Sequence, residues 1–457
     1  MTTPHKKKIL VVDDNEVFLN ALKSTIEAEG YAVTPSSEAQ GALHLIGLEN
    51  FDLILSDMQM PGMSGINFLK KVREQSQIPF ILMTGFSEIQ ETTDAHSIGA
   101  SGFLAKPFKR EELLSLVVSL IPAKKETVPE PAPEPTENDY VALPIENFIS
   151  GSNIRFSIHI RLSNRHFVKI AHQGEDVDPN KINQFKTKGI KFLYLSKPDY
   201  RDYVGFMTHL NKVASKSSTL DREKKNKIMR SAGEVLVSSL FKSEMNRESV
   251  EVSQAFVQST LDMISDEPQA LSLLASMNEH GDHLFAHCIG VSTVAVAIAH
   301  ALGWTAGSTL MKVSLSGLYH DVGKKEIPAE ILAKGRMQMS PEEVAIYQTH
   351  PQRGSDLLSQ VPGITDEITL VAGQHHENCV GTGYPRKLTL NKITPLARLI
   401  AVADAFVKLV IKNPDYPVPI DPQQAFNKMV SLKANELDPQ YVKALEACLK
   451  KEDKKAG

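Results

Sequence analysis

Residues 9–35 read ILVVDDNEVFLNALKSTIEAEGYAVTP: a short apolar run, an amphipathic stretch over 16–29 and a second short apolar run. The same alternation continues through FDLILSD at 51–57, PFILMTG at 79–85 and GFLAKPF at 102–108. Strands that alternate with helices of this length predict a parallel sheet that is covered on both faces. We therefore expect a doubly wound α/β domain over residues 1–121.

Polar side chains follow the predicted strands, at the point where each strand ends. They are Asp13 and Asp14 after the first strand, Asp57, Thr84 and Lys106. The carboxyl ends of parallel strands form the crevice in which open α/β sheets bind ligands. Three carboxylates there suit Mg²⁺, which would neutralise an incoming phosphoryl group, and Asp57 would then be the nucleophile. The alternative, that an Asp at a strand end only caps the next helix, explains one such residue but not this ordered set.

With these residues, the stretch 6–121 resembles the response-regulator receiver family. The resemblance implies a complete phosphorylation site, with Asp57 as the phosphoacceptor, Asp13 and Asp14 as Mg²⁺ ligands beside it, and Thr84 and Lys106 at the phosphoryl group. It also implies that Phe103 is the aromatic switch residue and that the Lys106–Pro107 bond is cis. A sensor histidine kinase would be the phosphodonor.

Length and composition restrict what the rest of the chain can be. At about 150 residues per domain, 457 residues suggest about three domains. The net charge of −4 gives no basic field for DNA. The chain has three scattered cysteines, Cys288, Cys379 and Cys448, so we do not expect a disulfide framework. With no signal-peptide pattern and no apolar run of about 18 residues, we expect a cytoplasmic protein without a membrane span.

The middle of the chain changes character twice. Residues 122–139, PAKKETVPEPAPEPTEND, predict an extended linker because they are rich in Pro and Glu. Residues 140–205 contain the alternating segments IRFSIHIRL and KFLYL around the helix-like DPNKINQFKTKG, which predicts a small β-rich α+β regulatory module. Over 206–274 apolar residues recur at helical spacing, which predicts connecting helices that could pair two subunits into a homodimer.

Residues 275–457 are predicted to form an all-α domain, and they hold an unusual cluster of histidines. Eight of the fifteen histidines fall between His280 and His376. Adjacent His320 and Asp321 could bind one metal ion or bridge two, and His283 and His287, four apart, would project from one face of a helix. Further candidates are His350, His375, His376 and Asp404. Mixed imidazole and carboxylate ligands suit Fe, Mn or Zn better than Ca or Mg.

Over roughly 275–450 the chain resembles the HD-GYP subgroup of the HD phosphohydrolase superfamily, through HDVGK at 320–324, HHENCVGTGYP at 375–385 and ARLIAVADAF at 397–406. The resemblance implies two divalent transition-metal ions, Fe or Mn being favoured, held by His287, His320, Asp321, His350, His375, His376 and Asp404. His283 is an additional candidate ligand. Asp321 would bridge the ions, Lys324 would lie near a substrate phosphate, and Gly383, Tyr384 and Pro385 would form a substrate loop. The implied activity is a phosphodiesterase that opens cyclic di-GMP.

The chain departs from the family's usual pattern beside the metal ligands. Asn378 stands for an Arg, Val380 for an Asp, Val407 for an acid and Asn413 for a basic residue. Loss of the side chains that hydrogen-bond to metal ligands commonly reduces metal affinity or activity about 10- to 100-fold. Two other functions therefore stay open: a module that binds a cyclic dinucleotide without cutting it, and a scaffold that docks a GGDEF-type synthase.

Overall fold

The computed structural model describes residues 6–84, 98–106, 108–121, 139–149, 151, 153–163, 166–265, 274, 283–433 and 435–456. The chain forms two compact units, Met1–Asp202 and Tyr203–Gly457. The first contains a parallel five-stranded sheet and an antiparallel four-stranded sheet, and the second is helical. The expected multidomain class, an α/β domain followed by a small α+β module and an all-α domain, is confirmed. The predicted linker, except for Asp139, lies outside the described residues.

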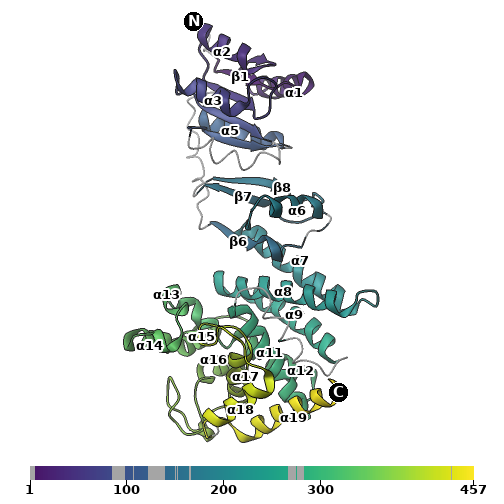
Figure 1. Ribbon diagram of the computed structural model, residues 1–457, viewed down its shortest axis with the longest axis vertical. Coiled ribbons are helices and arrows are strands. Elements are labelled where there is room, and N and C mark those ends of the chain that lie inside the picture. Colours follow the sequence, from purple (N-terminus) through teal and green to yellow (C-terminus); the bar gives the residue numbers. More distant parts are fainter. Residues whose placement is uncertain are drawn as a thin grey trace. The chain divides into compact units, whose positions relative to one another are not determined.

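The parallel sheet has the strand order β2-β1-β3-β4-β5 (Figure 1). Its strands are β1 (Lys8–Val12), β2 (Ala32–Ser36), β3 (Leu53–Asp57), β4 (Phe80–Thr84) and β5 (Gly102–Ala105). The helices around it are α1 (Glu16–Glu27), α2 (Ala39–Leu48), α3 (Gly65–Arg73) and α5 (Arg110–Leu120). Alternate residues of β1 pack into two different core clusters: Leu10 belongs to one cluster and Ile9 to the other. Every residue of β3 and β4 is buried. Both faces of the sheet are therefore covered, as the continuous apolar runs predict.

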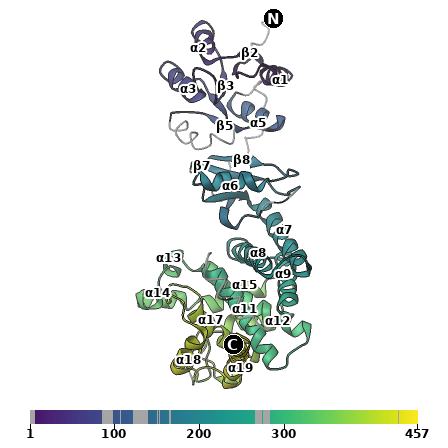
Figure 2. The ribbon, with the colours of Figure 1, turned by 45° about the vertical axis from the view of Figure 1, so that its right-hand side comes forward.

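The antiparallel sheet has the order β6-β9-β7-β8. Its elements are β6 (Tyr140–Pro144), β7 (Ile158–Ser163), β8 (His166–Ala171), β9 (Phe192–Ser196) and the helix α6 (Pro179–Thr187) (Figure 2). Asp178 caps α6, its carboxylate accepting from the N–H of Asn180 at 2.8 Å. Glu112 of α5 accepts from Lys169 Nζ of β8 at 2.9 Å and lies 2.8 Å from Nε2 of His172, the residue after β8, so side-chain contacts join these two elements within the first unit.

The second unit is built around α11 (His283–Ala301), which contacts α8, α12, α17 and α19. The helices before it are α7 (Lys197–Lys216), which begins in the first unit, α8 (Arg222–Lys242) and α9 (Arg247–Ser265). Those after it are α12 (Gly307–Tyr319), α13 (Ala329–Leu332), α14 (Pro341–Tyr347), α15 (His350–Ser359), α16 (Asp366–Gln374), α17 (Pro395–Val410), α18 (Pro422–Lys433) and α19 (Pro439–Ala456). Short 3-10 turns stand at Val322–Glu326, Arg336–Gln338 and Leu390–Lys392.

By length and composition alone, α11 could cross a membrane, with a mean hydropathy of 1.7 over its most apolar window. The sequence did not indicate this helix as a membrane span, because His287, Ser292 and Thr293 interrupt its apolar run. However, 78% of that window is buried inside the unit. A helix that is apolar all round is what the centre of a helical domain requires.

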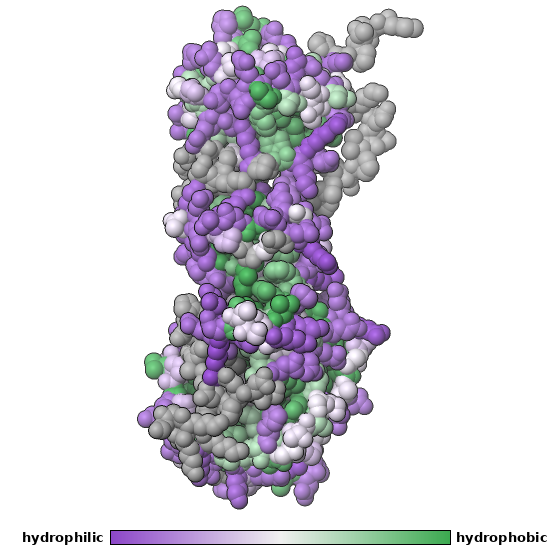
Figure 3. Space-filling model, turned by 90° about the vertical axis from the view of Figure 1, so that its right-hand side faces the viewer, coloured by the Kyte–Doolittle hydropathy of each residue, from purple (hydrophilic) through white to green (hydrophobic). Residues whose placement is uncertain are grey.

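The face in Figure 3 shows hydrophilic side chains around smaller groups of hydrophobic ones.

The apolar stripes of α8 and α9 are used inside the second unit. The two helices pack on each other, and α8 also contacts α11 while α9 contacts α12. Met229, Leu236 and Leu240 of α8 are buried there. These stripes therefore give no support to the predicted homodimer, which stays a prediction.

Candidate functional site

The strand-end residues of the first unit lie together. Lys106 Nζ is 2.6 Å from Asp13 Oδ2 and 2.8 Å from Asp57 Oδ1. Carboxylate oxygens of Asp13, Asp14 and Asp57 lie within 4.8 Å of one another and could hold a cation. Asn15 caps α1 directly after them, its Oδ1 accepting from the N–H groups of residues 17 and 18. Because the helix begins at once, both Asp side chains stay at the end of β1.

The other expected receiver residues lie on the neighbouring strands β4 and β5. Thr84, the last residue of β4, is buried, and its carbonyl accepts from the N–H of Lys106 at 2.8 Å. Phe103 of β5 is half-buried and packs against a core cluster. Burial raises the pKa of Asp57, despite the opposing effect of Lys106. Pro107 lies outside the described residues, so the expected cis bond before it stays a prediction.

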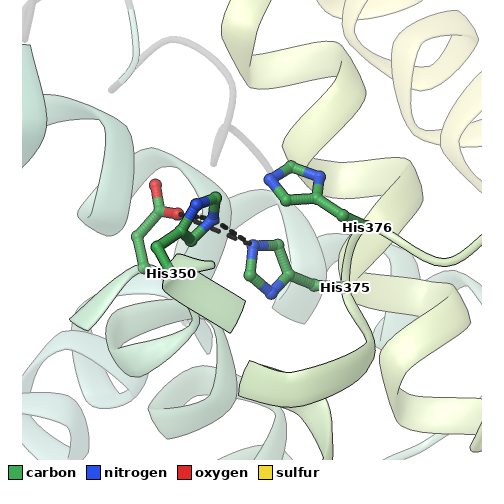
Figure 4. A group of neighbouring side chains, drawn as sticks. His350, His375 and His376 are labelled. Atoms are coloured by element: carbon green, nitrogen blue, oxygen red, sulfur yellow. Dashed lines mark hydrogen bonds and ion pairs between the residues drawn. The ribbon is translucent and has the colours of Figure 1, made fainter. Parts of the chain in front are cut away.

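The expected metal ligands of the second unit come from separate helices. His287 lies within α11, His320 and Asp321 follow α12, His350 begins α15, His375 and His376 follow α16, and Asp404 lies within α17. All are buried or nearly so, with His320, Asp321 and His350 at 0% exposure. Figure 4 shows His350, His375 and His376 gathered at one point. The packing of these helices thus brings together seven residues that the sequence spreads over more than a hundred positions.

Asp321 divides these ligands into two groups. Its Oδ2 lies 3.4 Å from His287 Nε2 and 3.3 Å from His320 Nε2. Its other oxygen, Oδ1, lies 3.3 Å from His350 Nε2 and 3.6 Å from His375 Nε2. His376 belongs to the Oδ1 group. One carboxylate therefore faces two imidazole clusters, which is the arrangement that a ligand shared by two metal ions requires.

Asp404 extends the Oδ2 group. Its Oδ1 lies 3.0 Å from His287 Nε2 and 3.7 Å from His320 Nε2. His283 is exposed at the start of α11 and belongs to neither group of ligand atoms. It lines the same cleft as His287 instead.

Backbone carbonyls orient three of the imidazoles. His320 Nδ1 lies 2.7 Å from Gly317 O, His350 Nδ1 lies 2.7 Å from Tyr347 O, and His375 Nδ1 lies 2.8 Å from Ala372 O. A carbonyl oxygen only accepts, so each Nδ1 carries the proton and donates. Each Nε2 is then the nitrogen that faces the centre, as in the histidine ligands of metals.

Buried ligand atoms in both groups lack hydrogen-bond partners among the described residues. They are Asp321 Oδ1, Asp404 Oδ1 and His376 Nε2. Leaving a buried polar atom unpaired costs about 1–3 kcal/mol. Three such atoms that converge on neighbouring points therefore fit metal ions.

Electrostatics agree with this donor set. Burial lowers the pKa of His350 to about 4 and also lowers the pKa values of His375 and His376, so these rings are neutral near pH 7, the form that binds metals. Burial opposes a charge on His320, but Asp321 and Asp404 raise its pKa to about 9. The carboxylates thus attract positive charge to a point where a metal ion could replace the proton.

The loop after His376 is held by residues whose role the sequence did not reveal. Glu377 is buried, and its two oxygens accept from the N–H groups of Arg386 and Leu388, both at 2.7 Å. The place of Glu377 directly after two histidines is the signal in the sequence that points to it. The loop returns at Tyr384, whose N–H donates to His376 O at 3.1 Å and whose ring centroid lies 4.6 Å from that of His376. Pro385 follows a cis peptide bond.

The four departures from the family pattern are outside the two groups of ligand atoms. Asn378 bonds to Thr382 within the loop, and Val380 is 51% exposed. Val407 is buried in the helix core, where a Cβ on Gly290 would meet it at 3.0 Å. Asn413 builds a turn, with its amide donating to the carbonyls of residues 408 and 411. These substitutions therefore change the surroundings of the centre and leave its donor set complete.

Lys324 and Lys408 border the centre. Lys324 Nζ donates to Asp321 Oδ2 at 2.5 Å, and Lys408 Nζ donates to Asp404 Oδ2 at 2.7 Å. Both lysines and His287 line a cleft that reaches the protein surface. The centre is thus open on the side of the Oδ2 group.

Comparison with known proteins finds two different domains in this chain. A response regulator receiver domain model matches residues 9–118, and an HD domain model matches residues 258–441. The cyclic di-GMP phosphodiesterase PA4108 of Pseudomonas aeruginosa is 27% identical over 47% of this chain and 51% of its own length. The transcriptional regulatory protein FixJ of Bradyrhizobium diazoefficiens is 34% identical over 26% of this chain and 58% of its own length. This chain therefore spans little more than half of either relative.

A solved structure, that of the HDG"Y"P protein Bd1817 of Bdellovibrio bacteriovorus, covers 68% of this chain and 100% of its own. Its TM-score is 0.54 at 22% identity, which shows a shared fold. By these matches, the chain joins a response regulator receiver domain, over residues 9–118, to an HD domain, over residues 258–441.

Proposed function

We propose that the second unit is a metal-dependent phosphodiesterase that opens a cyclic dinucleotide, cyclic di-GMP first. We further propose that phosphorylation of Asp57 by a sensor histidine kinase controls it. The observation that carries the enzymatic proposal is the position of Asp321, with one oxygen toward His287 and His320 and the other toward His350 and His375. The activity of the related phosphodiesterase from Pseudomonas aeruginosa supports the choice of substrate.

The donor set fits two divalent transition-metal ions. His287, His320 and Asp404 would hold one, His350, His375 and His376 the other, and Asp321 would be shared. Iron or manganese suits these imidazole and carboxylate ligands. Such an ion pair supplies an activated water near neutral pH and polarises the phosphate that is attacked.

The chain's own residues prepare the site in three ways. The carbonyls of residues 317, 347 and 372 hold the imidazoles in the ligand tautomer. Nearby charges, chiefly that of Asp321, outweigh the effect of burial and hold the pKa of Lys324 well above its usual value, so the lysine stays charged and can offset negative charge that develops on a phosphate. The ring of Tyr347, 5.5 Å from Lys324 Nζ, limits where that ammonium can lie.

Hydrolysis is supported over the two alternatives, binding alone and scaffolding. A protein that only bound or docked a partner would not need two imidazole clusters around one carboxylate. The departures at 378, 380 and 407 would favour the alternatives if they removed donors, but their side chains bond within the loop, face solvent or pack in the core. Docking of a GGDEF-type protein and formation of a homodimer stay proposals without a structural argument of their own.

The test combines metal analysis with turnover on the full-length chain. We expect two transition-metal ions per chain after reconstitution and conversion of cyclic di-GMP to a linear dinucleotide, both abolished in Asp321→Ala. Cyclic di-AMP and cyclic GMP-AMP would be assayed beside it. Two bound ions without turnover of any cyclic dinucleotide would rule out the enzyme and leave ligand sensing as the function.

A further inference from the structure

The cleft of the second unit extends well beyond the metal ligands. It begins at His287 and reaches the turn at 413–415, and it encloses about 630 Å³ with its open mouth included. Its lining therefore continues from the metal ligand His287 to side chains that could contact other parts of a bound molecule.

Positive charge dominates the lining of this cleft. Its cations are Lys324, Lys334, Arg336 and Lys408, and the acid in its lining is Asp415. Three of the cations have carboxylate partners, namely Asp321 for Lys324, Asp404 for Lys408 and Glu343 for Lys334. Arg336 is the fourth cation of the described lining.

The guanidinium of Arg336 is fixed in place but incompletely bonded. Its Cζ lies 4.9 Å from the ring centroid of Tyr347, whose ring lies 5.0 Å from that of His350. Its Nη1 is buried and has no hydrogen-bond partner among the described residues. Asp415 accepts from the backbone N–H of Arg336 at 2.5 Å, so that carboxylate holds the main chain of the residue in position.

This geometry favours an anion as the missing partner. A buried guanidinium nitrogen without an acceptor is costly, and phosphate oxygens are the acceptors that match the planar fork of an arginine. Tyr347 joins Arg336 to the ring of His350, so an anion at Arg336 would lie in the same cleft as the reacting phosphate, but against a different side chain. Leu332 and Met339 line the cleft as well and offer apolar surface to a base.

We infer that Arg336 binds the second phosphate of a cyclic dinucleotide, the one that is not hydrolysed. The inference rests on the proposed function and adds to it a residue that determines specificity. A substrate with a single phosphodiester leaves Arg336 without a partner, whereas a cyclic dinucleotide carries two phosphates on one ring. Arg336 would thus select two-phosphate rings over simple diesters.

The test compares two substrates in Arg336→Gln. For cyclic di-GMP we expect KM to rise about ten- to a hundredfold, the range of a charge-assisted hydrogen bond. For bis(p-nitrophenyl) phosphate, which has one phosphodiester, we expect kcat/KM within about twofold of the unchanged protein. Arg247→Gln is the matched control, since this arginine is 79% exposed on α9. Metal content measured on each variant separates loss of the centre from loss of Arg336.

Each outcome decides between the two proposals. An unchanged KM for cyclic di-GMP, or an equal loss on both substrates, overturns the role of Arg336 and leaves the proposed function intact. If the unchanged protein binds cyclic di-GMP without cutting it, the dissociation constant replaces KM, and a variant that binds as tightly as the unchanged protein overturns the inference. A metal-loaded chain that neither binds nor cuts cyclic di-GMP removes the proposed function, and the inference with it.

Discussion

Lys325 Nζ donates a hydrogen bond of 2.6 Å to the carbonyl oxygen of Ser243, the residue that directly follows α8. A second bond, of 3.2 Å, goes to the carbonyl of Leu240. The last carbonyls of a helix have no partner within the helix, and a lysine is well suited to bind them. Lys325 follows Lys324 directly, so the end of α8 is bonded to the segment that carries Asp321.

Replacing Lys325 by Met should destabilise the second unit by roughly 1–3 kcal/mol, because part-buried carbonyls would lose their donor. Chemical denaturation followed by circular dichroism would measure the change. Lys312→Met is the matched control, since Lys312 pairs with Glu367 on the surface, where an ion pair contributes about 0–1 kcal/mol. Equal losses of unfolding free energy in both variants would show that the bonds to α8 contribute no more than a surface ion pair does.

The close fit of the loop after His376 depends on Gly383. A Cβ at this position would lie 2.5 Å from His376 O and 2.6 Å from Glu377 Cα, so Gly383→Ala has to displace the backbone beside a metal ligand. We expect loss of at least one bound metal ion and of turnover. Gly205→Ala in α7 has nothing within 4 Å of the added Cβ and should be neutral or stabilising by about 0.5–1 kcal/mol. Full metal content in Gly383→Ala would refute the requirement for glycine.

His159 in the antiparallel sheet should make stability depend on pH. Burial lowers its pKa to about 4 from an ordinary 6.5, so the folded chain keeps this ring neutral while the unfolded chain protonates it. Its contribution to stability is complete above pH 6.5 and is lost as the pH falls toward 4, by at most about 3 kcal/mol. Thermal midpoints at pH 7.5 and pH 5 should differ less in His159→Phe than in the unchanged chain. An identical difference would disprove this source of pH sensitivity.

The sequence predicted the parallel sheet well because every apolar run there corresponds to one strand. The ligand set was accessible for a related reason, since HD and HH pairs stand at helix ends that meet in space. A bridging role for Asp321 was expected from the family resemblance, but which oxygen faces which cluster was not accessible, because it depends on side-chain direction after the end of α12. Arg336 was missed because no spacing links it to Tyr347, which follows eleven residues later and reaches it only through the packing of α14.

Phosphorylation of the first unit should depend on Asp57 and on Mg²⁺. Asp13, Asp14 and Asp57 could hold the cation, and Lys106 already bonds to two of them. With a small phosphodonor such as acetyl phosphate, we expect a hydroxylamine-sensitive acyl phosphate in the unchanged chain and none in Asp57→Asn. Chelation of Mg²⁺ should prevent its formation. Persistent labelling of the Asn variant would place the acceptor at another residue.

The two carboxylates of the metal centre should differ in what their removal costs. Asp404 Oδ1 faces His287 and His320 alone, whereas Asp321 also faces His350 and His375. Asp404→Ala should therefore weaken one ion and leave the group of His350, His375 and His376 with Asp321, so that about half of the metal remains. Asp321→Ala removes a ligand from both groups, and both ions should be lost. Elemental analysis after dialysis gives the stoichiometry, and thermal melting shows whether each variant is folded. Equal metal loss in two folded variants would mean that Asp321 does not bridge the two groups, and the two-ion assignment would fall with it.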